Sequence, residues 1–221
     1  LAVLITIMIQ AFRMAAEPFF FNRSKEENAQ KIYARVMKFF VIACCFMFLF
    51  IGLFLDAFRW IFITFANTQW AEGLEVVPLL ALGNIFLGIY YNLSVWYKLT
   101  NKNMIGALIT IGGAVITVVL NIVLIPKLHY TGAAIATFSC YLFMMLSSYW
   151  LGQKYYPIDY PIKRMLLYVV LALGAYGMSV FVASIVEMQA LKLAINTLIL
   201  FAFMLAIYTL EKDGLIKLYR T

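Results

Sequence analysis

The stretch Met104–Ile125, MIGALITIGGAVITVVLNIVLI, contains 22 residues and no charged side chain. A helix rises about 1.5 Å per residue, so about 20 apolar residues cross the hydrocarbon core of a membrane, which is about 30 Å thick. The strands of a membrane barrel would alternate in character over about 10 residues instead. This stretch therefore predicts a membrane-spanning helix.

Six further apolar runs fill most of the remaining chain. They are Leu1–Phe21, Phe39–Leu55, Val77–Tyr97, Gly132–Leu151, Met165–Val186 and Leu191–Leu210. Of the 221 residues, 65% are hydrophobic and 12% are charged, and the mean hydropathy is +0.94. A soluble domain carries about 25% charged residues. The sequence therefore predicts an all-α integral membrane protein, a helical bundle of seven spans. No basic segment or cleavage site precedes the first run, so we do not expect a signal peptide.

The stretch between the second and third runs, DAFRWIFITFANTQWAEGLEV (residues 56–76), is mixed in character. Its first part either extends the second span or lies in the membrane interface as an amphipathic helix. Trp60 and Trp70 suit the headgroup layer. The sequence alone leaves both alternatives open.

Basic residues divide unequally between the two sets of loops. One set, with the C-terminal tail, holds thirteen: Arg23, Lys25, Lys31, Arg35, Lys38, Lys98, Lys102, Lys154, Lys163, Arg164, Lys212, Lys217 and Arg220. The alternate set holds three, which are Arg59, Lys127 and Lys192. Because basic loops stay in the cytoplasm, this split predicts a cytoplasmic C-terminus. The net charge of +7 then belongs to a cytoplasmic rim and does not indicate nucleic-acid binding.

Residues with catalytic or metal-binding chemistry are sparse. The cysteines Cys44, Cys45 and Cys140 and the single histidine, His129, have no metal-ligand spacing, so buried free thiols are expected. The chain has no P-loop and no Gly-rich dinucleotide motif. We therefore expect no enzyme activity, no metal and no cofactor.

Arg13 and Glu17 interrupt the first run one helical turn apart, so both side chains lie on one face and are able to pair. Charges at membrane depth cost about 2.5 kcal/mol or more and normally face the protein interior or a wet cavity. Either Arg13 meets an anionic substrate group, with Glu17 as its partner or as a coupling site, or the two form a salt bridge that locks the helix.

Amides and a phenol form a polar stripe in the third span. Asn84, Tyr91 and Asn92 lie on one side of it, and Asn121 follows near the end of the fourth span. These groups either line a path for a polar solute or hydrogen-bond between helices. Small residues at every fourth position from Gly132 to Cys140 predict a packing seam. The last two spans are the least polar and are expected to face lipid.

Three segments resemble the polysaccharide flippases of the multidrug/oligosaccharidyl-lipid/polysaccharide superfamily, which export O-antigen and capsule precursors. They are AFRMAAEPFFF (Ala11–Phe21), WAEGLEVVPLLALGNIFLGIYYNLSVWYKLTNK (Trp70–Lys102) and NIVLIPKLHYTGAAIAT (Asn121–Thr137). The last combines an Asn near a helix end, Leu-Ile-Pro, a short loop and a small-residue helix start. The likeness extends from Ala11 to about Pro161.

The resemblance implies a MATE-like second lobe followed by two extra C-terminal helices. Residues 1–151 would then be five spans of that lobe without its first helix, 152–164 a cytoplasmic loop, and 165–221 two peripheral helices with the cytoplasmic tail. The chain is thus expected to be the C-terminal half of a longer protein, with an N-terminal lobe of the same protein as its partner.

The resemblance also implies a function. The protein would move an undecaprenyl-diphosphate-linked oligosaccharide from the cytoplasmic to the outer leaflet of a bacterial cytoplasmic membrane, with protons or sodium as candidate coupling ions. Arg13 is the candidate for the diphosphate, and Asn84, Tyr91 and Asn92 are the candidates for sugar contacts. A lipid II flippase would differ only in cargo.

Two other functions compete with this one. A multidrug or cation antiporter of the same superfamily would need more cavity carboxylates than Glu17. A polysaccharide polymerase or membrane glycosyltransferase would need a larger outer loop than the one that holds Arg59, Glu72 and Glu75.

Overall fold

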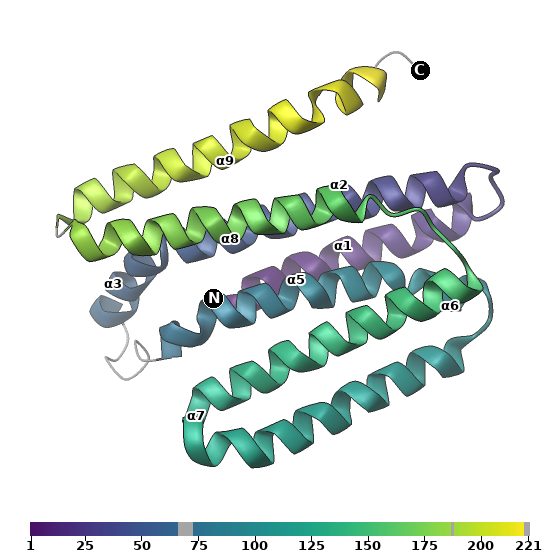
Figure 1. Ribbon diagram of the computed structural model, residues 1–221, viewed down its shortest axis with the longest axis horizontal. Coiled ribbons are helices and arrows are strands. Elements are labelled where there is room, and N and C mark those ends of the chain that lie inside the picture. The colour runs from purple at the N-terminus through teal and green to yellow at the C-terminus, as the bar shows by residue number, and fades with distance from the viewer. Residues whose placement is uncertain (66–72, 187, 219–221) are drawn as a thin grey trace.

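The computed structural model describes residues 1–65, 73–186 and 188–218, with the backbone alone at 61–63, 65 and 213–218. Every regular element in these ranges is helical, as predicted (Figure 1). The elements are α1 (Ala2–Arg23), α2 (Ala29–Leu53), α3 (Leu55–Phe65), η1 (Gly73–Val76), α5 (Val77–Leu93), α6 (Val95–Leu99), α7 (Asn103–Tyr155), α8 (Ile162–Ile185) and α9 (Gln189–Leu218). Trp70, Glu72 and Arg220, which the sequence predictions used, lie outside the described residues.

Six helices in the described ranges are long and apolar enough to cross a membrane. They are α1, α2, the segment from η1 through α6, α7, α8 and α9. The 53-residue α7 bends back at His129, where φ is 49° and ψ is −127°, and Figure 1 shows its two arms side by side. Each arm holds one predicted apolar run, so the six helices account for all seven runs except for one or two residues at the ends of three of them.

Small residues bring the two arms of α7 together. A Cβ atom added to Gly113 would lie 3.0 Å from the sulfur of Cys140, and one added to Gly132 would lie 2.7 Å from the carbonyl oxygen of Leu124. Gly132 and Cys140 belong to the predicted seam, and Ala136 between them is fully buried. The seam therefore packs against a neighbouring helix backbone, as predicted.

Gly132→Ala is expected to lower the melting temperature, because its new methyl group would press on backbone atoms that have no rotamer to change. Overpacking of this kind costs about 1–3 kcal/mol. Gly174→Ala in α8 is the matched control, since nothing lies within 4 Å of its added Cβ. Alanine is also more favourable than glycine in the interior of a helix, so the control variant should keep or slightly raise the melting temperature. Equal behaviour of the two purified variants on thermal unfolding would contradict this account of the hairpin.

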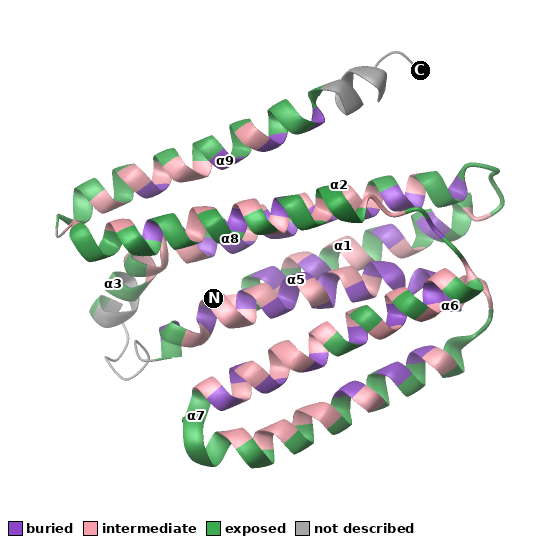
Figure 2. Cartoon of the chain, viewed as in Figure 1, coloured by how far each residue is buried: buried purple, intermediate pink, exposed green. Residues whose placement is uncertain are grey.

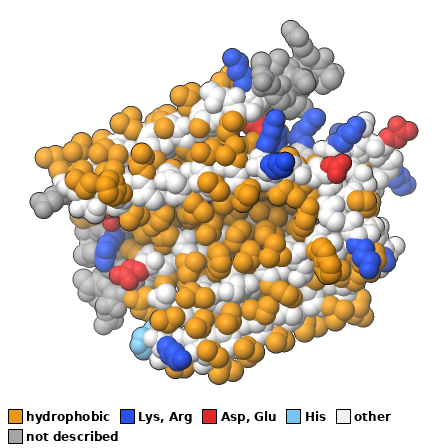
Figure 3. Space-filling model, viewed as in Figure 1, with side chains coloured by type: hydrophobic (Ala, Val, Ile, Leu, Met, Phe, Trp, Pro, Cys, Tyr) orange, Lys and Arg blue, Asp and Glu red, His pale blue; other side chains and the backbone are white. Residues whose placement is uncertain are grey.

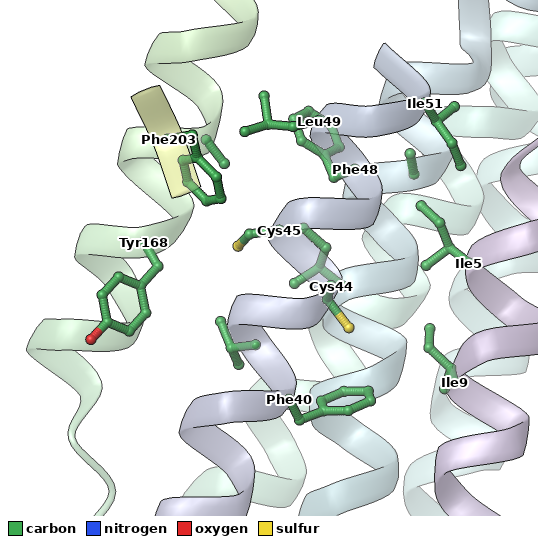
Figure 4. Packing of buried hydrophobic residues seen from close by; sticks show 14 of the residues in the cluster. Ile5, Ile9, Phe40, Cys44, Cys45, Phe48, Leu49, Ile51, Tyr168 and Phe203 are labelled. Carbon is green, nitrogen blue, oxygen red and sulfur yellow. The ribbon is translucent and has the colours of Figure 1, made fainter. Parts of the chain in front are cut away.

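The helices form successive layers with α2 and α5 inside. Helix α9 lies outermost beside α8, α2 packs on α8, α9, α1 and α5, and α5 packs on both α1 and α7 (Figure 1). The largest core cluster joins these helices through apolar side chains, among them Ile5, Cys44, Phe48 and Phe203 (Figure 4). Ile85 of α5 belongs to the same cluster. Cys44 and Cys45 are buried free thiols within it, as predicted.

One helix boundary differs from the sequence-based expectation, and the structure decides between the two alternatives left open for the segment after the second span. Helix α2 begins at Ala29, ten residues before the predicted span, so Lys31, Arg35 and Lys38 lie in a helix and not in a loop. The extension is stable because Tyr33 and Met37 bury against neighbouring helices. After Phe54, α3 starts as a separate helix that leaves the direction of α2 (Figure 1). It therefore does not extend the second span.

The surface is apolar along the helices and charged at their ends. Large apolar side chains such as Ile122, Trp150 and Phe181 are exposed on α7 and α8, and exposed positions line the outer faces of α7 and α9 (Figure 2). In Figure 3 most Lys and Arg side chains gather at one end of the bundle. Such a surface suits a multi-pass membrane protein whose apolar faces meet lipid.

Candidate functional site

Arg13 and Glu17 form the ion pair that their spacing predicts. The Arg13 Nε donates to Glu17 Oε1 over 2.8 Å within α1. The side chains keep 38% and 29% of their surface accessible, so neither is sealed in the core. Helix α1 holds this face toward α5 and α6, on which it packs. The pair is therefore accessible to a ligand from outside the packed core.

Lys98, near the end of α6, donates to the same Glu17 oxygen over 2.5 Å. The prediction that Lys98 lies in a loop is wrong, because α6 continues to Leu99 and carries the side chain to α1. The partners are 81 residues apart, so helical spacing gives no signal of their contact. Two cations share one carboxylate, and the cluster Arg13–Glu17–Lys98 has one surplus positive charge.

Tyr91 of α5 joins this cluster. The guanidinium carbon of Arg13 lies 4.7 Å from the centroid of its ring, a cation–π contact. Gln10 of α1 donates to the Tyr91 hydroxyl over 3.5 Å. The ring and the hydroxyl of Tyr91 therefore both face polar side chains of α1. This agrees with the prediction that the polar stripe faces a neighbouring helix or a polar path.

Asn92, next in α5, is 8% exposed. Its amide nitrogen donates to the carbonyl of Gly88 over 3.3 Å, while its Oδ1 atom has no hydrogen-bond partner among the described residues. Asn92 lines a cavity of about 10 Å³ together with Arg13, Glu17 and Tyr91. That is room for about one water molecule. A sugar would enter only after α1 and α5 move apart.

Asn84 and Asn121 lie away from this group. Asn84 accepts from Thr6 over 3.4 Å and donates to the carbonyl of Ala2 over 3.0 Å, so its hydrogen bonds join α5 to α1. Asn121 lies on the first arm of α7, where its Oδ1 atom is enclosed without a partner among the described residues. The structure brings together Arg13, Glu17, Tyr91 and Asn92 and leaves these two amides separate.

A second ion cluster, which the sequence did not predict, joins α2, α8 and α9. Glu211 of α9 is 2% exposed and accepts hydrogen bonds from Lys38 of α2 and Tyr168 of α8, with Arg164 of α8 at 3.5 Å. The last predicted span ends at Leu210, but α9 continues past it and includes Glu211. Its position offered a signal, since Glu211 follows the buried Phe203 and Ile207 at four-residue spacing on one helix face.

A third polar contact lies toward the other end of α9. Asn196 donates to the carbonyl of Leu53 in α2 and accepts from Ser179 in α8, both over 2.7 Å. The last two spans were expected to be the least polar and to face lipid. Their outer faces do carry exposed apolar residues, but their inner faces hold buried polar bonds to α2.

No protein-family model and no curated protein sequence matches this chain. Among the described residues, no three His, Cys, Asp or Glu side chains come together as a metal site would need. The geometry of the site itself indicates its chemistry. That geometry is a partly accessible cationic cluster beside an aromatic ring and an unpaired amide oxygen.

Proposed function

We propose that the protein is a transporter of the polysaccharide-flippase type, which moves an undecaprenyl-diphosphate-linked oligosaccharide to the outer leaflet for surface polysaccharide synthesis. The surplus positive charge of the Arg13–Glu17–Lys98 cluster carries this proposal. A cation inside a membrane-length helix is costly unless an anion or a wet cavity compensates it. A diphosphate is an anion that would do so.

The neighbouring groups suit the rest of such a cargo. Arginine presents a fork of donors that matches phosphate oxygens, and Lys98 adds a second cation. The ring of Tyr91 and the unpaired oxygen of Asn92 suit the faces and hydroxyls of a sugar. The lipid tail would stay among the exposed apolar side chains of the helices. A contact of Asn84 or Asn121 with the sugar stays a prediction.

The proposed orientation rests on the basic end of the bundle (Figure 3). By the positive-inside rule this end faces the cytoplasm, together with the C-terminus, in a bacterial inner membrane. The cluster lies toward this end, where a cytoplasmic precursor would enter. In the MATE-like arrangement, a further lobe of the same protein would face α1, and rocking of the two lobes would carry the head group across. A proton or sodium gradient is the proposed energy source.

A multidrug or cation antiporter is the first competing function. It would attract cations with free cavity carboxylates, whereas Glu17 is already paired with Arg13 and Lys98. A polysaccharide polymerase or membrane glycosyltransferase is the second. It would need a catalytic outer subdomain, whereas the described residues between α2 and α5 form the two short helices α3 and η1.

Deletion of the gene in its own host tests the proposal. A flippase mutant should lose surface polysaccharide and accumulate complete lipid-linked oligosaccharide that a membrane-impermeant glycosidase cannot reach in spheroplasts. A plasmid copy should restore export. Accumulated single repeat units accessible from outside would favour the polymerase instead, and unchanged polysaccharide with greater drug susceptibility would favour the antiporter.

A further inference from the structure

A pocket of about 280 Å³ opens at the basic end of the bundle, between α2 and the segment that leads from α7 into α8. Its lining residues are Lys31, Ala34, Arg35, Lys38, Asp159, Pro161 and Arg164. It shares none of them with the cavity beside Arg13. The volume is close to the lower end of the range for small-molecule sites, about 300–1,000 Å³.

The charges of this pocket come from two walls. Lys31, Arg35 and Lys38 are spaced by four and three residues, which places them on one face of α2. Arg164, in the first turn of α8, forms the opposite wall. Asp159 lies at the pocket, and Glu211 lies behind Lys38. Four cations against two carboxylates leave two surplus positive charges around an open space.

The four cations differ in how they are held. Lys38 and Arg164 both contact Glu211, so the buried carboxylate fixes the inner part of the pocket. Lys31 and Arg35 are exposed and make no hydrogen bond or ion pair within the described part of the chain. The pocket thus offers two positioned cations and two free ones to an incoming anion.

We propose that this pocket binds the phosphate group of an anionic phospholipid. The phosphodiester of a phospholipid such as phosphatidylglycerol carries one negative charge, which the two surplus positive charges of the pocket more than balance. Arginine and lysine are the side chains that bind phosphate oxygens most strongly. Basic pockets between membrane helices at the cytoplasmic side are suited to lipid head groups.

The surroundings favour a lipid over free phosphate. Helix α8 continues from Arg164 with the exposed apolar side chains Leu166, Leu167 and Val170. These would contact the acyl chains while the phosphate stays at the pocket. Both α2 and α8 are of membrane length, and the pocket lies at the end of each, at the expected depth of the head groups. The inference does not depend on the proposed transport function.

Lipid-dependent thermal unfolding of the full-length protein in dodecyl maltoside tests the proposal. Phosphatidylglycerol should raise the melting temperature by roughly 5 °C at a hundredfold excess over its Kd, and phosphatidylcholine should leave it unchanged. In Lys31→Gln/Arg35→Gln, the apparent Kd for phosphatidylglycerol should rise at least tenfold. Lys25→Gln/Lys154→Gln is the matched control, since it removes two cations near the same end that do not line the pocket, and it should keep the wild-type Kd.

Each other outcome overturns the proposal. Equal Kd values in both double variants would mean that the basic rim as a whole attracts the lipid. If phosphatidylglycerol does not raise the melting temperature of the wild-type protein, that result alone excludes the site. An equal rise with 10 mM inorganic phosphate would assign the pocket to free phosphate. If the pocket variant fails to purify, the single changes Lys31→Gln and Arg35→Gln are measured in its place, and each should weaken binding severalfold.

Discussion

Glu211→Ala is expected to destabilise the protein by about 3–5 kcal/mol, the cost of removing one partner from a buried ion pair. Glu211 is 2% exposed and joins three helices, since Lys38 lies on α2 and Tyr168 and Arg164 lie on α8. Its loss leaves the Lys38 ammonium, 12% exposed, without its carboxylate and the Tyr168 hydroxyl without its acceptor. Thermal or denaturant unfolding in detergent would measure the loss.

Glu26→Ala is the matched control for this prediction. Glu26 also pairs with a cation, Arg23, at 3.1 Å, but both side chains are nearly half exposed. Pairs of this kind contribute about 0–1 kcal/mol. If Glu211→Ala and Glu26→Ala unfold at the same temperature, the buried cluster does not hold α8 and α9 to α2.

A double change separates the charge from the hydrogen bonds. In Lys38→Met/Glu211→Gln no unpaired charge is buried, and the glutamine oxygen still accepts from Tyr168. We expect this variant to be more stable than Glu211→Ala, because most of the loss comes from the stranded lysine charge. A double variant as unstable as Glu211→Ala would assign the loss to the missing ion pair itself and not to a stranded lysine charge.

The helical fold was predictable because the apolar runs that determine it can be read directly from the sequence. Apolar runs of membrane length lie between polar segments, and each run forms a helix. The residues at which the helices begin and end were harder to predict. The basic residues Lys31, Arg35 and Lys38 were read as a loop, but α2 includes them because its other face carries Tyr33 and Met37 into the core. Charge alone therefore does not mark the end of a helix whose opposite face is buried.

The candidate site was predictable only within one helix at a time. The Arg13–Glu17 pair follows from four-residue spacing, and the neighbouring Tyr91 and Asn92 follow from the polar stripe on α5. The third ion of the cluster, Lys98, and the partner of Lys38 come from segments 81 and 173 residues away in the chain. No periodicity connects such residues, because helix–helix packing decides which of them meet.

Arg13→Ala is expected to reduce export of the lipid-linked oligosaccharide roughly 10- to 100-fold. A hydrogen bond to a charged group contributes about 1.5–3 kcal/mol, and about 1.4 kcal/mol corresponds to a factor of ten. The same change should affect stability little, because the Arg13 side chain is 38% exposed. Arg23→Ala is the matched control on α1, since Arg23 pairs only at the surface with Glu26 and should export normally. Export is measured as surface polysaccharide in a deletion strain.

A salt bridge that merely locks α1 makes a different prediction for Glu17→Gln. If locking is the role of the pair, loss of either partner should reduce export and thermal stability together. If the cluster binds the diphosphate, Glu17→Gln adds a net positive charge, because Arg13 and Lys98 then stand without a carboxylate. The purified Glu17→Gln variant should retain at least as much lipid-linked oligosaccharide as the wild type, while Arg13→Ala retains less and Arg13→Lys an intermediate amount. Equal loss in Arg13→Ala and Glu17→Gln would assign the pair to structure and remove Arg13 from the substrate site.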